Sequence, residues 1–170
     1  MSNTHFSKDL SLSSLDLRNF EGCPATIGGD FFGSDNSNLV NLVGTPALAS
    51  RFFIHNCENL KSLEGLKVAS SKKNSMPLHL SFDFAGCNNL SDISVFKDFR
   101  LGLSLSLYLK KTSVSLETIV TTLYNIRQEA GSWSFLSSDH EPKTIERTYL
   151  LFEKLDFNQE KLSKAIDLVF

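Results

Sequence analysis

The sequence predicts an α/β protein in which short parallel strands stack as an irregular repeat solenoid, capped at one end by C-terminal helices. Two observations support this prediction. A short phrase with Cys or Asn followed by Leu recurs through the first two thirds of the 170-residue chain. The last third has apolar residues at helical spacing instead. We therefore assign the repeats to residues 1–114 and a helical cap to residues 115–170.

The repeated phrase is clearest in NCENLKSLEG (56–65) and GCNNLSDISVF (86–96), and DNSNLVNLVG (35–44) has a related form. Each copy carries an anchoring leucine, and two residues upstream of it are spaced so that they share one face of an extended strand. The anchors are Leu39, Leu60 and Leu90, and the upstream pairs are Phe31 with Gly33, Phe52 with Ile54, and Phe82 with Phe84. We expect all of these residues to face a common core.

Weaker copies flank the three clear ones. LDLRNF (15–20) predicts a first unit and LSLSLYLKKT (103–112) a last one, while the polar stretch 68–77 reads as a loop insertion. Small polar residues follow each predicted strand, where they can satisfy backbone groups inside the turn. These residues are Asn19, Asp35, Asn36, Asn56, Cys57, Cys87 and Asn88.

The spacing resembles the leucine-rich-repeat pattern L-x-x-L-x-L-x-x-N/C-x-L. More narrowly, CPATIGGDFFGSDNSNLVNLVGTP and CENLKSLEGLK are similar to the degenerate GGDFxCSNNxLTSLEGAP repeats common in bacteriophage and bacterial proteins. The resemblance covers roughly residues 10–116 and implies a parallel-stranded solenoid and a phage origin. The chain departs from the pattern in its irregular repeat lengths, in the inward Gly33 and in the polar insertion, so the number of units stays open.

The C-terminal third reads as helices. Ser115 is a candidate N-cap for a first helix that ends near Gly131, Asp139 can cap a second, and Asn158 can open a third. The apolar faces would carry Leu116, Ile119, Val120, Leu123 and Ile126, then Ile145, Tyr149, Phe152 and Leu155, then Leu162, Ala165, Ile166 and Val169. An open solenoid needs its last strand covered, so we interpret these helices as a cap.

Composition excludes several function classes. The net charge of −2 gives no electrostatic reason to expect nucleic acid or an anionic membrane as a partner. The chain contains neither an apolar run of signal-peptide length nor a membrane span. Three widely spaced cysteines suit reduced thiols, so we predict a cytoplasmic protein, in the host cytoplasm if the chain is phage-encoded.

The sequence offers no catalytic constellation. His55 and Cys57 could form a nucleophile pair, but Cys57 and Cys87 fill equivalent repeat positions, which indicates a structural role for both. The four histidines lie apart, and the glycine-rich IGGDFFG (27–33) lacks the lysine of a phosphate loop. We therefore predict a non-enzyme without cofactor or metal.

The remaining candidate is the outward face of the sheet. Its residues should align in columns, one reading Asp16, Phe32, Phe53, Asp83 and Tyr108, and the next reading Arg18, Ser34, His55, Ala85 and Lys110. Two exposed phenyl rings beside an arginine and a histidine have the composition of a protein-binding hot spot. The predicted protein-binding residues are Phe32, Arg51, Phe53, His55 and Tyr108. The competing interpretation is that the helices or a flanking loop fold over these rings.

The sequence therefore favours a non-enzymatic repeat protein that binds another protein. If the phage resemblance holds, that partner is a host protein, for example a component of a defence system that the chain inhibits or modulates. The alternative is a structural or assembly protein that self-associates through the exposed phenylalanines.

Overall fold

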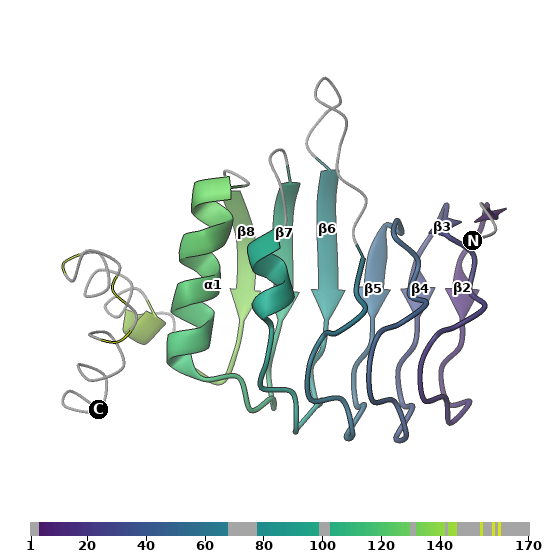
Figure 1. The fold of residues 1–170 in the computed structure, drawn as a ribbon, viewed down its shortest axis with the longest axis horizontal. Helices are drawn as coiled ribbons and strands as arrows, with labels where there is room; N and C mark the ends of the chain where they lie inside the picture. The colour runs from purple at the N-terminus through teal and green to yellow at the C-terminus, as the bar shows by residue number, and fades with distance from the viewer. Residues whose placement is uncertain are drawn as a thin grey trace.

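The fold is a parallel-strand β-solenoid of about four turns. The computed structural model describes residues 4–67, 78–98, 103–129, 132–141 and 143–145, and the single residues 154, 158 and 160. Its main sheet has six strands in the order β2-β4-β5-β6-β7-β8, and every neighbouring pair is parallel (Figure 1). The strands are β2 (Leu10–Ser11), β4 (Phe31–Phe32), β5 (Arg51–Phe53), β6 (Leu78–Asp83), β7 (Leu103–Tyr108) and β8 (Ser132–Ser137). The predicted solenoid with a parallel sheet is confirmed.

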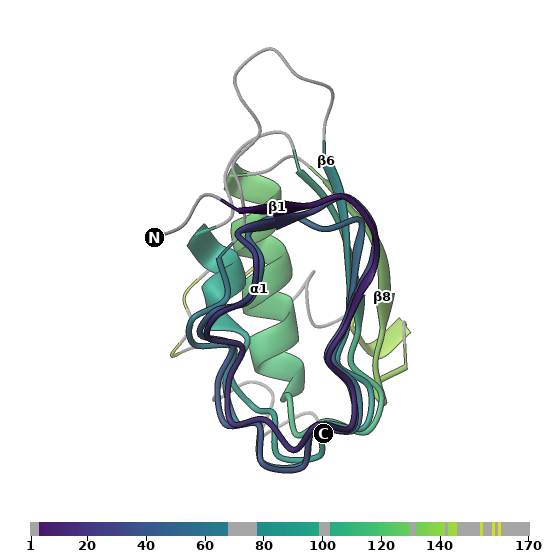
Figure 2. The same cartoon turned by 90° about the vertical axis from the view of Figure 1, so that its right-hand side faces the viewer.

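The chain returns from each strand to the next on one side of the sheet, which we call the inner face (Figure 2). The return segments are irregular near the N-terminus and become the 3-10 helix η1 (Ser94–Asp98) and the helix α1 (Leu116–Glu129) further along. A second, two-stranded parallel sheet joins β1 (His5–Phe6) to β3 (Thr26–Ile27) at another edge of the coils. In the part of the chain that the structure describes, these return segments leave the opposite, outer face of the main sheet open (Figure 2).

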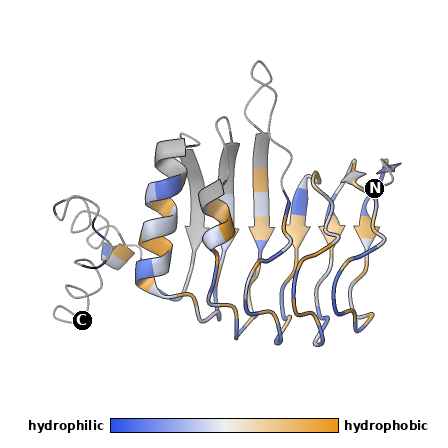
Figure 3. Cartoon of the chain, in the orientation of Figure 1, coloured by the Kyte–Doolittle hydropathy of each residue, from blue (hydrophilic) through white to orange (hydrophobic). Residues whose placement is uncertain are grey.

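Phenylalanine rings from successive coils form the centre of the core. The Phe52 ring lies 4.7 Å from that of Phe82 and 6.1 Å from that of Phe31, and Phe31 meets Phe20 edge to face at 4.9 Å. Figure 3 shows the same repetition as apolar residues at equal height in neighbouring strands. The predicted inward residues are all buried: Phe31, Gly33, Phe52, Ile54, Phe82 and Phe84, with the anchors Leu39, Leu60 and Leu90.

Phe20 explains the glycine that departs from the repeat pattern. A Cβ added at Gly33 would stand 2.5 Å from the tip of the Phe20 ring, closer than any side-chain carbon can approach. In this coil the Phe20 ring of the preceding coil occupies the space that a side chain at position 33 would need, so glycine fits there.

Buried side chains that hydrogen-bond to the backbone form a ladder in the turns after β4, β5 and β6. The amide of Asn36 is fully buried; its Oδ1 accepts from the backbone N–H groups of Leu15 and Leu17, and its Nδ2 donates to the carbonyls of Leu12 and Gly33. In the next coils Cys57 and Cys87 occupy the same place, as predicted from their spacing.

The residue before each ladder position has a left-handed backbone. Its φ is 59° at Ser14, 58° at Asp35, 56° at Asn56, 76° at Gly86 and 55° at Lys111. Asp, Asn and Gly tolerate this conformation better than other residues do, which is why the repeated phrase begins with them.

The prediction for the first unit is wrong in its register. The first strand of the main sheet is β2 (Leu10–Ser11), not LDLRNF, and Ser11 rather than Asp16 pairs with Phe32. Asp16 lies in the following turn with a positive φ, and its Oδ1 accepts from Asn38 Nδ2. Leu15, not Asn19, takes the ladder position beside Asn36.

The second outward column needs the same correction. Ser13, rather than the predicted Arg18, stands beside Ser34: its Oγ accepts from the backbone N–H of Ser34. The first coil is therefore shifted by five residues from the predicted one.

The C-terminal third begins with α1, whose first turn receives the Ser115 hydroxyl: Ser115 Oγ accepts from the backbone N–H of Thr118. Its inward positions Leu116, Ile119, Val120 and Leu123 are buried in the core. The strand β8, which the sequence did not predict, continues the sheet beyond residue 114 by pairing with β7. Nearly all of the second and third predicted helices, and the insertion 68–77, lie outside the described residues, although Ile145 is described and buried.

Candidate functional site

The outer face of the sheet carries side chains in rows, because the strands are parallel and their register is regular. The central row runs across all six strands; from β2 to β7 it consists of Ser11, Phe32, Phe53, Asp83 and Tyr108, and Ser137 of β8 continues its register. Apart from Ser11 and Ser137, this is the predicted column. The residue two positions further along each strand forms a second row, in which Ser34 Oγ accepts from the backbone N–H of His55 at 3.2 Å.

Phe32 and Phe53 form a stacked pair in the central row. Their ring centroids are 5.0 Å apart and the ring planes differ by only 6°. Both residues are half-buried, and stacking shields one face of each ring. α1 packs on the inner face with the core, so it does not cover this pair (Figure 2).

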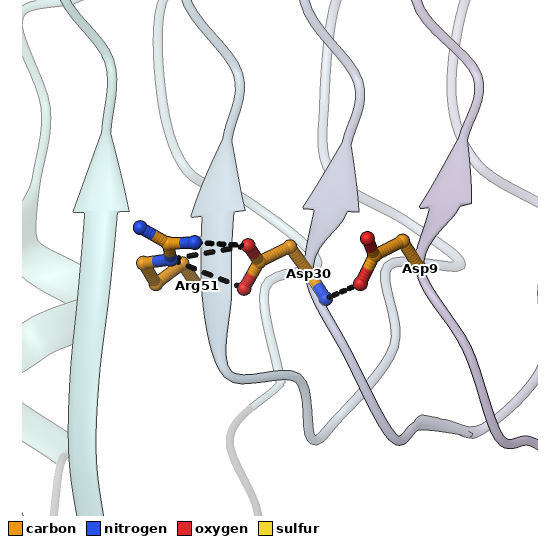
Figure 4. A network of polar contacts seen from close by, with 3 residues as sticks. All are labelled: Asp9, Asp30 and Arg51. Carbon is orange, nitrogen blue, oxygen red and sulfur yellow. Dashed lines mark hydrogen bonds and ion pairs between the residues drawn. The ribbon is translucent and has the colours of Figure 1, made fainter.

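Arg51 is held beside the rings by an acidic partner. Its Nη2 lies 2.5 Å from Oδ2 of Asp30, and its Nε donates to both carboxylate oxygens at 3.1 and 3.2 Å (Figure 4). The guanidinium carbon is 5.3 Å from the centroid of the Phe53 ring, within the range of a cation–π contact. The hydrogen bond with Asp30, and then the charge of that carboxylate, raise the pKa of Arg51 above its ordinary value.

Asp30 is itself fixed by the coil before it. Its backbone N–H donates to Oδ1 of Asp9 at 2.9 Å (Figure 4). The Asp30 side chain is only 11% exposed, whereas that of Arg51 is 58% exposed. The buried carboxylate therefore orients an accessible cation, and the donors of Arg51 that Asp30 does not use face outward.

The other two predicted residues lie on the same face. His55 is half-buried and lies two residues beyond Phe53, just past the end of β5, with the fully buried Ile54 between them. Tyr108 is 38% exposed and stands in the central row, separated from Phe53 by Asp83 of β6. Two strand spacings of ~4.8 Å put it about 10 Å from Phe53 along the row.

Asp9 and Asp30 are not among the residues predicted from the sequence. A signal was present: Asp9, Asp30 and Arg51 are each 21 residues apart, as are Ser11, Phe32 and Phe53. Aligning the units on their leucines did not reveal this 21-residue period, because the first coil has Arg18 where the next two have Leu39 and Leu60.

The thiols take part in the ladder and not in the face. Cys57 and Cys87 are fully buried, and Cys87 Sγ donates to the carbonyl of Ile54 at 3.0 Å. The hydrogen bond with Cys57, and then burial, raise the pKa of Cys87. Cys57 Sγ donates to the backbone carbonyl of His55 at 3.6 Å, a main-chain contact that does not involve the imidazole.

The described part of the chain offers neither a metal site nor a membrane span. It contains no group of three or more His, Cys, Asp or Glu side chains that could hold a metal ion. No helix within it is both long enough and apolar enough to cross a membrane. Comparison with protein-family models, with curated proteins and with solved structures gives no match.

Proposed function

We propose that the chain is a non-enzymatic binding protein that engages another protein through the outer face of its sheet. The contact residues in this proposal are Phe32, Arg51, Phe53, His55 and Tyr108. The observation that carries it is the stacked Phe32–Phe53 pair on a face that the return segments leave open. Aromatic residues and arginine dominate the binding energy of protein interfaces when they sit near the centre of an accessible patch.

The arrangement of Arg51 supports the same proposal. A free arginine side chain loses rotamer entropy when a partner orders it, and this loss weakens binding. Asp30 has already restricted Arg51 to one orientation. The exposed guanidinium can then donate to a carboxylate or a main-chain carbonyl of the partner, while the ring edges of Phe32 and Phe53 receive an apolar side chain.

The sequence resemblance extends the proposal. Under it, the solenoid is a degenerate leucine-rich repeat of the α/β class, and helices within residues 115–170, which also contain β8, form its cap. The similarity to phage repeats then makes the partner a host protein, for example a component of a defence system that the chain inhibits, in the host cytoplasm. The proposal needs no cofactor, nucleic acid or membrane.

The test begins with copurification from an extract of the host, followed by reconstitution with the purified partner. Phe53→Ala should raise the Kd for that partner about 30-fold, which corresponds to ~2 kcal/mol at a hot spot. Phe6→Ala is the matched control, because Phe6 is also exposed (39%) but belongs to the second sheet. It should leave the Kd within about twofold of wild type.

Two results would contradict the proposal. If Phe53→Ala and Phe6→Ala bind equally well, the outer face is not the contact surface. If Phe53→Ala instead changes the mass of the purified chain alone, the stacked rings serve self-association, which is the assembly role that competes with partner binding.

A further inference from the structure

The N-terminal end of the solenoid has an open strand edge, and this feature is independent of the outer face. Among the described strands, β2 is the first of the main sheet, so it has a neighbour on one side only. The backbone N–H groups of Leu10, Leu12 and Ser14 all donate to the next coil, to the carbonyls of residues 30, 32 and 34. Because successive residues of a strand alternate, the N–H and C=O groups of Asp9, Ser11 and Ser13 point away from the sheet.

Apolar side chains that are buried in the other coils are partly exposed in the first coil, because no coil precedes it among the described strands. Leu10 pairs with Phe31 in the sheet register; Phe31 and the equivalent Phe52 are fully buried, whereas Leu10 is half-buried. Leu15 is 57% exposed, although the ladder residue beside it, Asn36, is completely buried. Terminal units of repeat proteins normally present a polar outer surface, and here the exposed Leu15 interrupts such a surface.

Within residues 4–20, nothing at the edge blocks another strand. The side chains of Asp9 and Ser13 fold back onto the next coil, where each accepts from a backbone N–H group. The exposed Ser11 between them is small, and no proline interrupts this stretch. Natural sheets protect an edge with proline, a bulge, lysine or a very short strand. Of these, β2 has its short length and the neighbouring Lys8, but no proline.

We propose that two copies of this chain pair through β2, so that the two sheets continue into one another across a twofold axis at Ser11. The pairing is antiparallel, with Ser11 opposite its own copy and Asp9 opposite Ser13. In this register each outward N–H of these residues meets a carbonyl of the other copy.

The same register matches the side chains. Leu10 of one copy lies opposite Leu12 of the other on the inner face, so leucines extend the core across the axis. No like charges stand opposite each other, since Asp9 meets a serine. A twofold interface needs a surface that is complementary to itself, and the Leu-Ser-Leu sequence at 10–12 has this symmetry.

The first measurement is the mass of the full chain by sedimentation, with any purification tag at the C-terminus. We expect the average mass to rise from the monomer value of 19.0 kDa towards twice that value between micromolar and millimolar concentration. A mass that stays at the monomer value throughout overturns the proposal.

The second measurement tests the register by exchanging charges. Ser11→Lys and Ser11→Asp each put two like charges at the axis, so each variant alone should dimerise at least tenfold more weakly at low salt. Mixing the two variants should restore the dimer as a heterodimer, because the lysine of one chain then faces the aspartate of the other across the axis. If mixing restores nothing, β2 does not pair with β2.

The controls separate this edge from the outer face and from damage to the fold. Ser11→Thr keeps the hydroxyl and the backbone donor and should dimerise like wild type. Ser91→Lys makes the same charge change at an exposed serine outside the sheet and should also have no effect. Circular dichroism should show both Ser11 charge variants folded. Phe53→Ala should leave the mass unchanged. Loss of the dimer in that variant would mean that the dimer interface lies on the outer face and not at β2.

Discussion

A single position of the repeat is filled by different chemical groups for the same purpose. Asn36 has an amide that both donates and accepts, and it uses both functions on backbone groups of the first coil. Cys57 and Cys87 offer only a weak S–H donor, and each donates to a backbone carbonyl. The first coil has a hydrophobic residue at this position, so Asn36 must satisfy the turn of two coils.

Asn36 is therefore the most costly polar residue to remove from this ladder. Asn36→Ala should lower the free energy of unfolding by ~3 kcal/mol or more, because several buried backbone groups lose their partner at about 1–3 kcal/mol each. Asn38→Ala is the control, since its amide is exposed and binds only the side chain of Asp16 among the described residues. That control should cost less than ~1 kcal/mol in urea denaturation, as expected for an exposed hydrogen bond. Equal losses would mean that the buried amide does not satisfy the turn.

Substitutions of the neighbours Phe52 and Phe53 test the assignment of the inner and outer faces of the sheet. Phe52 lies in the core between Phe31 and Phe82, so Phe52→Ala should cost about 3–5 kcal/mol. Phe53→Ala removes a half-buried ring from the outer face and should cost less than half as much. Thermal denaturation of the two variants measures this difference. A larger loss in Phe53→Ala would show that the two faces are assigned the wrong way round.

At the scale of elements, the sequence predicts the strands well where three signals agree. The units at β4, β5 and β6 have paired inward residues, a left-handed turn residue and a leucine anchor, and their inward residues were identified correctly. The first unit lacks the leucine anchor, because Arg18 takes its place, and the repeat pattern therefore favoured LDLRNF instead.

β8 was missed for a different reason. The segment WSFLSS follows a helix and precedes a polar turn, and it contains neither the small polar phrase nor a downstream leucine. Its strand character comes from pairing with β7, a tertiary effect that local propensity does not reveal. The role of Asp30 was missed for a similar reason. It depends on a contact with Asp9 of the preceding coil, and only an alignment of several coils could have indicated that contact.

The helix α1 depends on its first turn. Ser115→Ala should cost about 1 kcal/mol, because the N–H of Thr118 loses its acceptor at the start of the helix. Ser115→Asp should stay close to wild type, since a carboxylate accepts the same bond and interacts favourably with the helix dipole. Urea denaturation of both variants provides the comparison. If Ala and Asp behave alike, the cap contributes nothing measurable.

At the scale of the whole molecule, each coil contacts mainly the coils before and after it. Stability in such a stack is highest in the middle and lowest at an uncovered end. The amides of Ile54 and Phe84, which bond to the next strand in the centre of the sheet, should exchange with solvent only through extensive unfolding. The amides of Leu10 and Leu12 should exchange through opening of the first coil alone.

Native-state hydrogen exchange at a concentration where the chain is monomeric checks this gradient. We expect the opening free energy at Leu12 to be lower than that at Ile54 by several kcal/mol. Uniform protection along the sheet would mean that the coils unfold as one unit. At higher concentration, pairing of β2 with a second copy should raise the protection of the first coil selectively.

The period of 21 residues that links Asp9, Asp30 and Arg51 also governs how this chain can change in length over generations. Loss or gain of one residue within a strand would turn the rest of that strand over and exchange its core and surface residues. Within the first three coils, loss or gain of 21 residues would keep the inward residues of the remaining strands in the core. Gene duplication and recombination would therefore preserve the fold when they act in steps of a coil, while most smaller insertions are confined to the turns and return segments.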